Sequence, residues 1–241
     1  MLEAGCHTDS VFCTLTYDDR LRVSNQLGNL VPSDLQLFMK RLRKRMDVPI
    51  RFFAVGEYGE QTWRPHYHAA LFGVSLAEEE LIREAWGLGH VDVGDLTRES
   101  AAYICGYVVK KLTAPDDTRL EGRQPEFARM SNRPGIGALA ARGIGRELTK
   151  RGASTALAEV GDVPTVARVD NKKMPLGRYL RAQIRKEVGW DAKAPKEVGR
   201  VLALKKSFES REDIERKKEA RKAHALRAEK RAKISASKGK I

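Results

Sequence analysis

Cysteines are few in this sequence and long apolar runs are absent, and both shortages limit what the protein can be. None of its three cysteines stands in a Cys-x-x-Cys pair, so no disulfide framework is expected and a reducing compartment is favoured. No stretch approaches the ~18 apolar residues that a membrane span requires. No basic segment followed by an apolar one begins the chain, so no signal peptide is evident. Together these absences predict a cytosolic protein.

Acidic residues are scarce relative to basic ones. The chain has 45 Lys and Arg against 32 Asp and Glu, for a net charge of +13 and a pI of about 9.8. Such a balance makes a polyanion the first partner to consider. Residues 191–241 hold 17 basic and 8 acidic residues and so carry +9 of that charge. We therefore expect a nucleic-acid partner, with weak nonspecific DNA binding by the tail.

Hydrophobic periodicity predicts an alternating series of strands and helices. The predicted strands are 11–17, 50–59, 66–73 and 90–96, and the predicted helices are 32–46, 75–87 and 98–112. Ser33 is the expected N-cap of the first helix, and Ser75 with Glu78 forms a capping box for the second. The short connection between 50–59 and 66–73 predicts an antiparallel hairpin. The expected class is therefore α+β, a central and mainly antiparallel sheet flanked by helices.

Beyond residue 112 the pattern weakens. A helix is expected inside 133–152 and a short strand at 165–169. Residues 205–233 are charged, rich in alanine and free of proline and glycine, which is typical of a solvated helix or a disordered tail. We expect a main domain over 1–150, a poorly defined extension over 151–204 and a basic helical or disordered tail over 205–241.

Two of the five histidines, His66 and His68, stand two residues apart in a predicted strand. Alternate residues of a strand share a face, so both imidazoles point to one side of the sheet. Glu57 ends the preceding strand and could bring a carboxylate to the same face. Two imidazoles and a carboxylate suit a divalent cation and leave positions open for substrate oxygens. The alternative is a partly exposed hairpin whose histidines lie together by chance, with Glu57 as an exposed turn residue.

Two tyrosines form a second candidate site in the predicted helix 98–112. Tyr103 and Tyr107 are four residues apart and share a helix face, and Lys110 and Lys111 follow one turn later. An ammonium group near a phenol favours the phenolate, which is a competent nucleophile at phosphorus. The alternative is that both rings pack on the sheet while the lysines are solvated.

The histidine and tyrosine motifs together resemble those of the HUH endonucleases. "PHYHAALFG" precedes "AAYICGYVVKKL" in the order and at the separation typical of that superfamily, and "FCTLTYDD" is similar to its first motif. These motifs, with "FAVGEYGEQTWRPHYHAALFG" and "PEFARMSNRPGIG", resemble the replication initiators of small single-stranded DNA phages. The resemblance is strongest to the gokushovirus-like branch of the Microviridae and covers roughly residues 11–145.

This resemblance implies a ferredoxin- or RRM-like sheet and a metal-dependent DNA nicking and joining activity that starts rolling-circle replication. A tyrosine attacks the origin phosphodiester and stays joined to the 5′ phosphate, which leaves a 3′-hydroxyl for a polymerase. The metal is expected to be Mg²⁺ or Mn²⁺. The implied ligands are Glu57, His66 and His68, the implied nucleophiles are Tyr103 and Tyr107, and Lys110 and Lys111 are expected near the phosphate or the leaving group.

The implied partners are single-stranded DNA and viral origin DNA, met in the cytoplasm of the bacterial host and without a membrane. A host polymerase is expected, and also a host helicase, because the sequence contains no GxxxxGK[ST] loop for nucleotide binding. Basic side chains near the motifs are candidates for phosphate contacts, although a basic helix face is otherwise merely solvated. The candidates are Lys40, Arg41, Arg43, Lys44, Arg45 and Arg64.

Three other interpretations stay open. A relaxase or transposase of the same superfamily shares the chemistry, although most such transposases use a single tyrosine. A noncatalytic nucleic-acid-binding protein also fits a basic α+β chain, and it predicts that His66→Ala and Tyr107→Phe leave DNA affinity and function intact. A hydrolytic metalloenzyme would usually have more Asp or His ligands nearby, whereas Ala69 and Ala70 follow His68.

Overall fold

The computed structural model describes most of the chain up to residue 196. The described residues are 1–21, 28–59, 62–110, 116–150, 157, 161–169 and 172–196, with scattered residues between 215 and 226. They belong to two compact units, one of His7–Ser131 with Arg221–Ile241 and one of Met1–Cys6 with Asn132–Ala220. The division into 1–150, 151–204 and 205–241 stays a prediction.

The first unit is built on a five-stranded sheet in which every pairing is antiparallel. Its strand order is β4-β1-β3-β2-β5. The strands are β1 (Ser10–Thr16), β2 (Arg51–Tyr58), β3 (Pro65–Phe72), β4 (Val91–Asp95) and β5 (Phe127–Met130). Up to β4 the element order is β-α-β-β-α-β, as in ferredoxin-like folds. The predicted fold class is confirmed, and the four predicted strands lie within one residue of their expected bounds.

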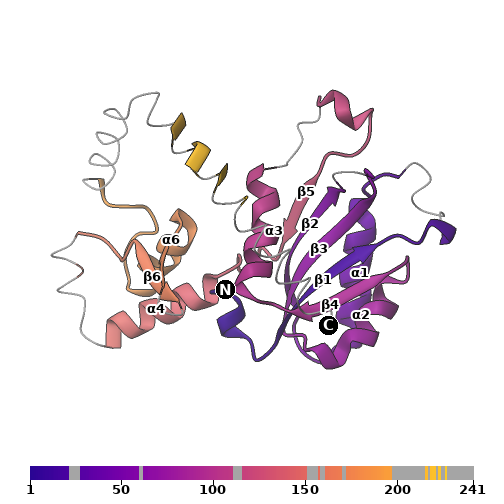
Figure 1. Cartoon of the computed structure of the whole chain (residues 1–241). Coiled ribbons are helices and arrows are strands. Elements are labelled where there is room, and N and C mark those ends of the chain that lie inside the picture. The colour runs from indigo at the N-terminus through magenta and orange to yellow at the C-terminus, as the bar shows by residue number, and fades with distance from the viewer. Residues whose placement is uncertain are drawn as a thin grey trace. The chain divides into compact units, whose positions relative to one another are not determined.

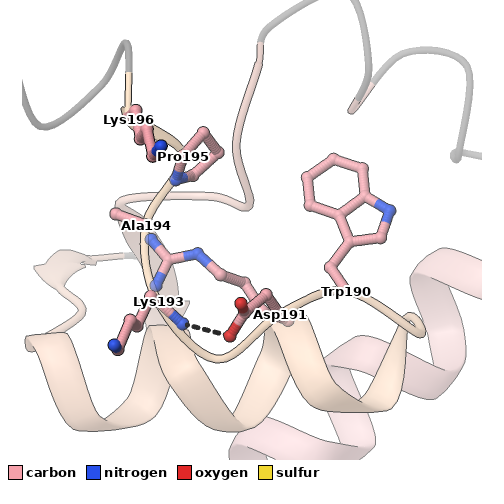
Figure 2. Close-up of a pocket in the computed structure, with 7 residues that line it drawn as sticks. Trp190, Asp191, Lys193, Ala194, Pro195 and Lys196 are labelled. Carbon is pink, nitrogen blue, oxygen red and sulfur yellow. Dashed lines mark hydrogen bonds between the residues drawn. The ribbon is translucent and has the colours of Figure 1, made fainter.

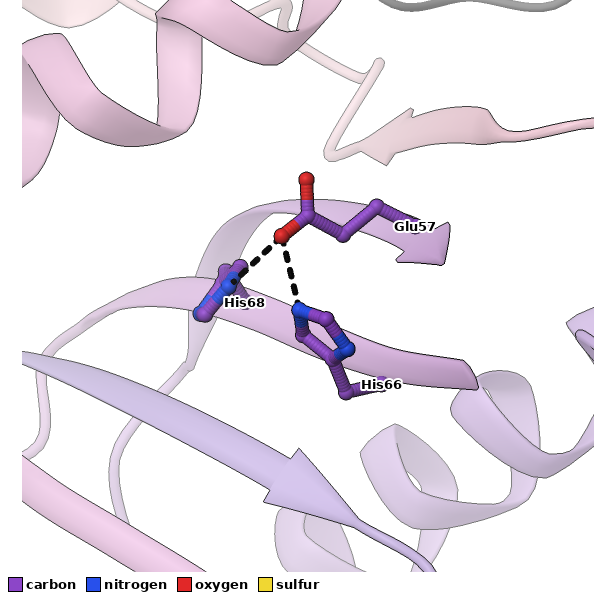
Figure 3. A group of neighbouring side chains, drawn as sticks. All are labelled: Glu57, His66 and His68. Carbon is purple, nitrogen blue, oxygen red and sulfur yellow. Dashed lines mark hydrogen bonds and ion pairs between the residues drawn. The ribbon is translucent and has the colours of Figure 1, made fainter. Parts of the chain in front are cut away.

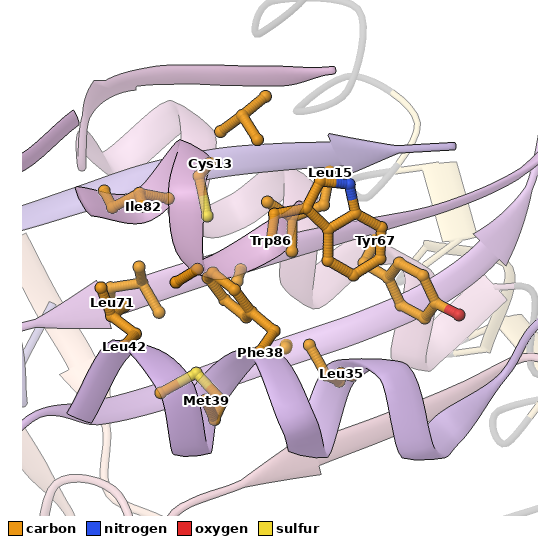
Figure 4. Packing of buried hydrophobic residues seen from close by; sticks show 14 of the residues in the cluster. Cys13, Leu15, Leu35, Phe38, Met39, Leu42, Tyr67, Leu71, Ile82 and Trp86 are labelled. Atoms are coloured by element: carbon orange, nitrogen blue, oxygen red, sulfur yellow. The ribbon is translucent and has the colours of Figure 1, made fainter. Parts of the chain in front are cut away.

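Helices cover both faces of this sheet (Figure 1). Helices α1 (Pro32–Arg45) and α2 (Glu79–Trp86) pack on one face, and α3 (Arg98–Lys110) packs on the other. Because side chains alternate along a strand, Cys13, Leu15 and Tyr67 point into the main core with the two helices (Figure 4). Their neighbours Thr14, His66 and His68 therefore point to the α3 face. The main core thus holds up a second face on which polar groups are free to gather.

The helix ends follow the sequence at α2 but not at α1. Ser75 and Glu78 form the expected capping box at the start of the 3₁₀ turn Leu76–Glu78 that leads into α2, and Gly87 ends α2 with φ of 60°. The expected cap at Ser33 is wrong, because the N-cap is Val31 and makes no side-chain cap. Pro32 occupies the first helical position, where its fixed φ suits the helix and its missing N–H is not needed.

A buried polar network ties β1 and β3 to the start of α1. The Tyr17 hydroxyl donates to Asp34 Oδ2 at 2.8 Å and lies 2.8 Å from the Tyr67 hydroxyl. The Tyr67 hydroxyl also accepts from the Val31 N–H at 2.8 Å. Burial raises the pKa of Tyr17, and the neighbouring Tyr67 raises it further, so the network stays uncharged. Since Tyr67 stands between His66 and His68, this anchor also fixes the strand that carries both histidines.

The second unit contains helices α4 (Ala138–Lys150) and α6 (Arg178–Glu187) and a two-stranded ribbon of β6 (Val166–Val169) and β7 (Lys172–Pro175). Its core buries Ala141, Val163, Leu176 and Ile184. The helix expected inside 133–152 and the strand expected at 165–169 are confirmed, whereas β7 and α6 were not predicted. The expected helix or tail over 205–233 lies largely outside the described residues.

A buried ion pair and a pocket lie near the C-terminal end of α6. Asp162 accepts from Arg185 Nε at 2.7 Å and Nη2 at 2.6 Å, and it also pairs with Arg181. Burial raises the pKa of Asp162, but the hydrogen bond from Arg185 and the charges of both arginines bring it below its usual value. Figure 2 shows an adjoining pocket of about 450 Å³, lined by Arg185, Trp190, Asp191, Lys193, Ala194, Pro195 and Lys196. In the described part of the chain, no helix is both long and apolar enough to cross a membrane.

Candidate active site

The β2–β3 hairpin brings the three predicted metal ligands together. Glu57 lies directly opposite His66 in the antiparallel register, and His68 is two residues further along β3 on the same face. The hairpin loop is closed by the Gly59 N–H, which donates to the Arg64 carbonyl at 3.0 Å. Figure 3 shows the three side chains pointing toward one another from the two strands. The sequence-based grouping of these residues is therefore present in the structure.

The cluster is tight and nearly closed to solvent. Both Nε2 atoms approach the same carboxylate oxygen, His66 at 2.7 Å and His68 at 3.1 Å from Glu57 Oε1. The Glu57 and His68 side chains are 4% and 6% exposed, and His66 is 18% exposed. One candidate ligand atom from each residue lies within 4.8 Å of the others, a grouping able to hold a metal ion. The expectation of an exposed turn carboxylate at Glu57 is thus excluded.

The hydrogen bonds around His66 argue for a positive charge between it and Glu57. His66 Nδ1 lies 3.1 Å from the Arg64 carbonyl oxygen, which can only accept, so Nδ1 must carry a hydrogen. In a neutral imidazole the lone pair is then on Nε2, which faces the carboxylate oxygen at 2.7 Å. Two lone pairs at that distance repel unless a proton or a metal cation lies between them. The donor set is therefore arranged for a cation.

The second carboxylate oxygen supports the same conclusion. Glu57 Oε2 is buried and has no hydrogen-bond partner among the residues that the structure describes. A buried unpaired carboxylate oxygen is costly, and a bound cation would satisfy it. Burial raises the pKa of Glu57, but the hydrogen bonds from His66 and His68 outweigh burial and hold it below its usual value. Glu57 is therefore ionised, as a metal ligand must be.

His68 is held on every side. Thr14, its direct cross-strand partner on β1, places Oγ1 3.0 Å from His68 Nδ1. Phe12 stacks on the His68 ring with centroids 5.6 Å apart and an interplanar angle of 17°. Burial lowers the pKa of His68 more than the Glu57 carboxylate raises it, so this imidazole stays neutral and able to coordinate. The Thr14 hydroxyl can accept from Nδ1–H and so leave the Nε2 lone pair for a metal.

Helix α3 brings the first predicted tyrosine to this cluster. The Tyr103 ring meets the His68 ring edge to face, with centroids 5.1 Å apart, and Phe12 with centroids 6.3 Å apart. Ile104 beside it is buried against Val55 of β2, which fixes the helix to the sheet. Tyr103 is partly exposed and therefore lies at the edge of the site.

The remaining residues of the tyrosine motif are described less fully. Tyr107 and Lys110 belong to α3, so Tyr107 follows Tyr103 by about one turn, but their side chains are outside the described set. Lys111 lies outside the described residues altogether. The roles predicted for Tyr107, Lys110 and Lys111 stay predictions.

The basic residues predicted to contact DNA are not gathered at the cluster. Those of α1 lie on the helix that covers the opposite face of the sheet. Arg41 donates to the carbonyls of Ala85 and Trp86 at the end of α2, at 2.6 and 3.0 Å. Arg43 donates to the Ile50 carbonyl at 3.1 Å. Both guanidinium groups thus take part in packing, as arginines near a helix end often do.

The other predicted DNA contacts are more open. Lys40, Lys44 and Arg45 are exposed, and Arg45 lies 3.6 Å from Glu84. Arg64 donates to Asp19 Oδ1 and to the Tyr17 carbonyl, both at 3.1 Å. Arg64 is also next to the histidine strand in sequence, so of the six it is the nearest along the chain to the cluster. Their role in DNA binding stays a prediction.

Two functional candidates have no counterpart in the sequence-based set. Thr14 and Phe12 of "FCTLTYDD" contact His68 from β1, across 54 residues in the case of Thr14. Their alternation with Cys13 and Leu15 places them on the face opposite the main core. That pattern alone could have suggested the shared face, but the pairing of Thr14 with His68 depends on the register of two distant strands.

Comparison with known proteins agrees with this site. Residues 10–112 match the family model for the replication-associated protein ORF2. The match begins with β1 and ends just beyond α3, so it contains the sheet strands β1–β4, the Glu57–His66–His68 cluster and both motif tyrosines. This segment is a domain of the replication-associated protein family, which confirms the resemblance to the replication proteins of small phages. No solved structure gives a significant match.

Three curated relatives carry the same kind of name. The chain is 33% identical over 138 residues to replication-associated protein VP4 of Bdellovibrio phage phiMH2K, covering 48% of this chain and 43% of that protein. It is 37% identical over 147 residues to replication-associated protein ORF2 of Spiroplasma virus 4, covering 52% and 45%. For replication-associated protein ORF4 of Chlamydia phage 1 the identity is 31% over 141 residues, covering 48% and 34%. The chain thus spans less than half the length of each of these relatives.

Proposed function

We propose that this protein starts the replication of a small single-stranded DNA phage by nicking one strand at the origin and later rejoining it. The observation that carries the proposal is the buried Glu57–His66–His68 cluster with the Tyr103 ring against His68. A cation-binding group beside a tyrosine is the pair of parts that phosphodiester transfer to a phenol requires. The names of the phage relatives support a part in replication.

The proposed step exchanges one phosphodiester for another. A tyrosine phenol gives up its proton, and its oxygen forms a bond to phosphorus. The bond from phosphorus to the 3′ oxygen breaks, and that oxygen takes up a proton and leaves as a 3′-hydroxyl. The 5′ phosphate stays on the protein. One ester bond is made for each one broken, so the reverse step can reseal DNA without ATP.

Glu57, His66 and His68 would hold the divalent cation, with Mg²⁺ or Mn²⁺ as the proposed metal. When bound, such a cation offsets negative charge on the scissile phosphate. Thr14 keeps the hydrogen of His68 on Nδ1 by accepting it, and the Arg64 carbonyl does the same for His66. Phe12 restricts rotation of the His68 ring and excludes water from one side of it. These contacts preorganise the ligands.

Tyr103 and Tyr107 would be the two nucleophiles. Tyr103 lies at the cluster, and Tyr107 belongs to the same helix one turn later. Two tyrosines would allow one to cut while the other takes part in releasing a finished circle. Lys110 and Lys111 would lie near the phosphate or the leaving oxygen. In this proposal the nicking and joining activity belongs to residues 1–150, and the later residues are appended to it.

The proposed substrates are single-stranded DNA and the viral origin. Because the chain has no P-loop, strand separation would come from a host helicase and synthesis from a host polymerase, inside the bacterial cell. A relaxase or transposase would share the residues, and the tyrosine pair favours the replication initiator among these.

A covalent-adduct assay tests the proposal. The full chain is incubated with Mn²⁺ or Mg²⁺ and single-stranded origin DNA, and protein–DNA bands are resolved on a denaturing gel. An adduct is expected that is lost with chelator, with the double variant Tyr103→Phe/Tyr107→Phe and with His66→Ala/His68→Ala. Tyr179→Phe and His90→Ala, which alter exposed residues outside the cluster, serve as matched controls and should leave the adduct intact. No adduct, with DNA binding retained, would overturn the enzymatic proposal in favour of a noncatalytic DNA-binding protein.

A further inference from the structure

Positive charge is concentrated outside the replication-associated domain. Residues 1–131 include the whole 10–112 match, yet they hold 16 Lys and Arg against 19 Asp and Glu, a net charge of −3. Residues 132–196 hold 14 against 6, a net charge of +8. Affinity for DNA depends mainly on Lys and Arg that neutralise phosphates. The domain with the candidate active site is therefore poorly equipped to attract DNA by itself, and the second unit is well equipped.

Within the second unit, the β6–β7 ribbon presents unpaired cations. Arg168, Lys172 and Lys173 are exposed, and none of them forms an ion pair with the residues that the structure describes. Other basic side chains of this unit have acidic partners. Arg146 pairs with Glu187 and Lys150 with Glu147. The ribbon therefore keeps its charge available for a partner.

The ribbon also breaks a rule of strand pairing. Arg168 lies directly opposite Lys173, and Lys172 stands next to Lys173 at the position opposite Val169. Like charges placed directly across an antiparallel pair destabilise it. A local conflict without compensation inside the fold is typical of a functional surface. An external polyanion would supply the missing compensation.

The ribbon is exposed along its length and anchored at its base. Leu176 is buried in the core of the unit, and its N–H donates to the Thr165 carbonyl at 2.8 Å. Ala167 packs against that core, whereas Arg168 and Lys173 lie on the other face of the ribbon. Four residues at about 3.3 Å each give a length of roughly 13 Å, close to the ~12 Å width of the DNA major groove, which admits a two-stranded ribbon.

We propose that the β6–β7 ribbon is a docking surface for duplex DNA, with Arg168, Lys172 and Lys173 against the phosphates. The inference rests on the proposed function, since it assigns duplex binding to a place apart from the nicking residues. The segment 165–176 contains no aromatic residue. Proteins that bind single strands usually stack bases on aromatic rings, so the composition favours a duplex.

The test compares two triple variants of the full chain by fluorescence anisotropy with labelled duplex DNA at several salt concentrations. Arg168→Gln/Lys172→Gln/Lys173→Gln should weaken binding by roughly 10- to 100-fold near 0.1 M salt and lower the salt slope by about 2.7, or about 0.9 per lost contact. The matched control, Lys40→Gln/Lys44→Gln/Arg45→Gln, removes equal charge from α1 and should leave that slope nearly unchanged. Thermal unfolding of both variants should match the wild type, because all six side chains are exposed.

Each outcome is decisive for the ribbon. Equal losses in the two variants would show a net-charge effect and overturn the assignment. Equal loss on a single strand of the same sequence would overturn the assignment to duplex DNA. The ribbon variant should still form the covalent adduct with single-stranded DNA if the proposed function holds. If no version of the protein forms an adduct but duplex binding is lost as expected, the proposed function fails and the docking surface stands.

Discussion

Glu57→Gln is the substitution that most sharply separates a metal ligand from a structural residue. A glutamine keeps the shape of the side chain and removes its charge, so a cation loses its carboxylate ligand. At a metal concentration 100 times its Kd, binding stabilises the folded state by about 2.7 kcal/mol. Each kcal/mol raises the melting temperature by about 2–4 °C for a chain of 150–250 residues. The wild type should therefore gain about 5–10 °C from Mn²⁺, and Glu57→Gln should gain almost nothing.

The metal-free comparison gives the reasoning its second test. In the metal-free protein Glu57 is a buried charge whose Oε2 has no partner among the described residues. A glutamine amide can donate to the His66 Nε2 lone pair, so the variant should be within about 1 kcal/mol of the wild type, or more stable, before metal is added.

Differential scanning fluorimetry with and without Mn²⁺ measures both effects, and Glu80→Gln, at an exposed position on α2, is the control. A full metal-dependent rise in Glu57→Gln would refute the assignment of Glu57 as a ligand. So would a metal-free loss of about 3–5 kcal/mol, which is the size expected when a stabilising buried ion pair is broken.

Three further substitutions test the support of the site and the independence of the second unit. Thr14→Val should lower Mn²⁺ affinity about 10- to 100-fold in calorimetry, since the His68 Nδ1 partner is lost, whereas Thr14→Ser should retain it; equal affinities would refute the role of the hydroxyl. Tyr67→Phe should reduce the free energy of unfolding in urea by about 1–3 kcal/mol, because the Val31 N–H loses its acceptor; an unchanged midpoint would count against the anchor. Asp162→Asn should destabilise the second unit by about 3–5 kcal/mol by leaving Arg185 unpaired, with Mn²⁺ affinity unchanged; a parallel loss of metal affinity would contradict two separate units.

The first unit could be predicted well from local sequence patterns. Period-2 alternation located its first four strands, and the short connection between two of them required the hairpin that sets Glu57 against His66. Those ligands were therefore predictable from contacts close in sequence. Strand β5 was missed because four residues with little alternation do not stand out from a loop.

Contacts between distant segments could not be predicted in the same way. The partnership of Thr14 with His68 depends on the register of β1 against β3. The arginines of α1 looked like a DNA-binding face, but Arg41 and Arg43 turn to backbone carbonyls that only the tertiary fold brings near. In the second unit, β7 and α6 lie in a strongly charged sequence in which few apolar residues mark a core-facing stripe.

Identification of the residue joined to DNA tests the central claim most directly. The adduct formed with origin DNA and Mn²⁺ is digested with a nuclease and with trypsin, and the nucleotide-bearing peptide is sequenced by mass spectrometry. Cleavage after Arg98 and Lys110 gives the peptide 99–110, which holds both motif tyrosines. The account predicts a nucleotide 5′ phosphate on Tyr103 or Tyr107 in this peptide, and none when His66 and His68 are alanine. A nucleotide on any other peptide, or the same adduct without the histidines, would contradict it.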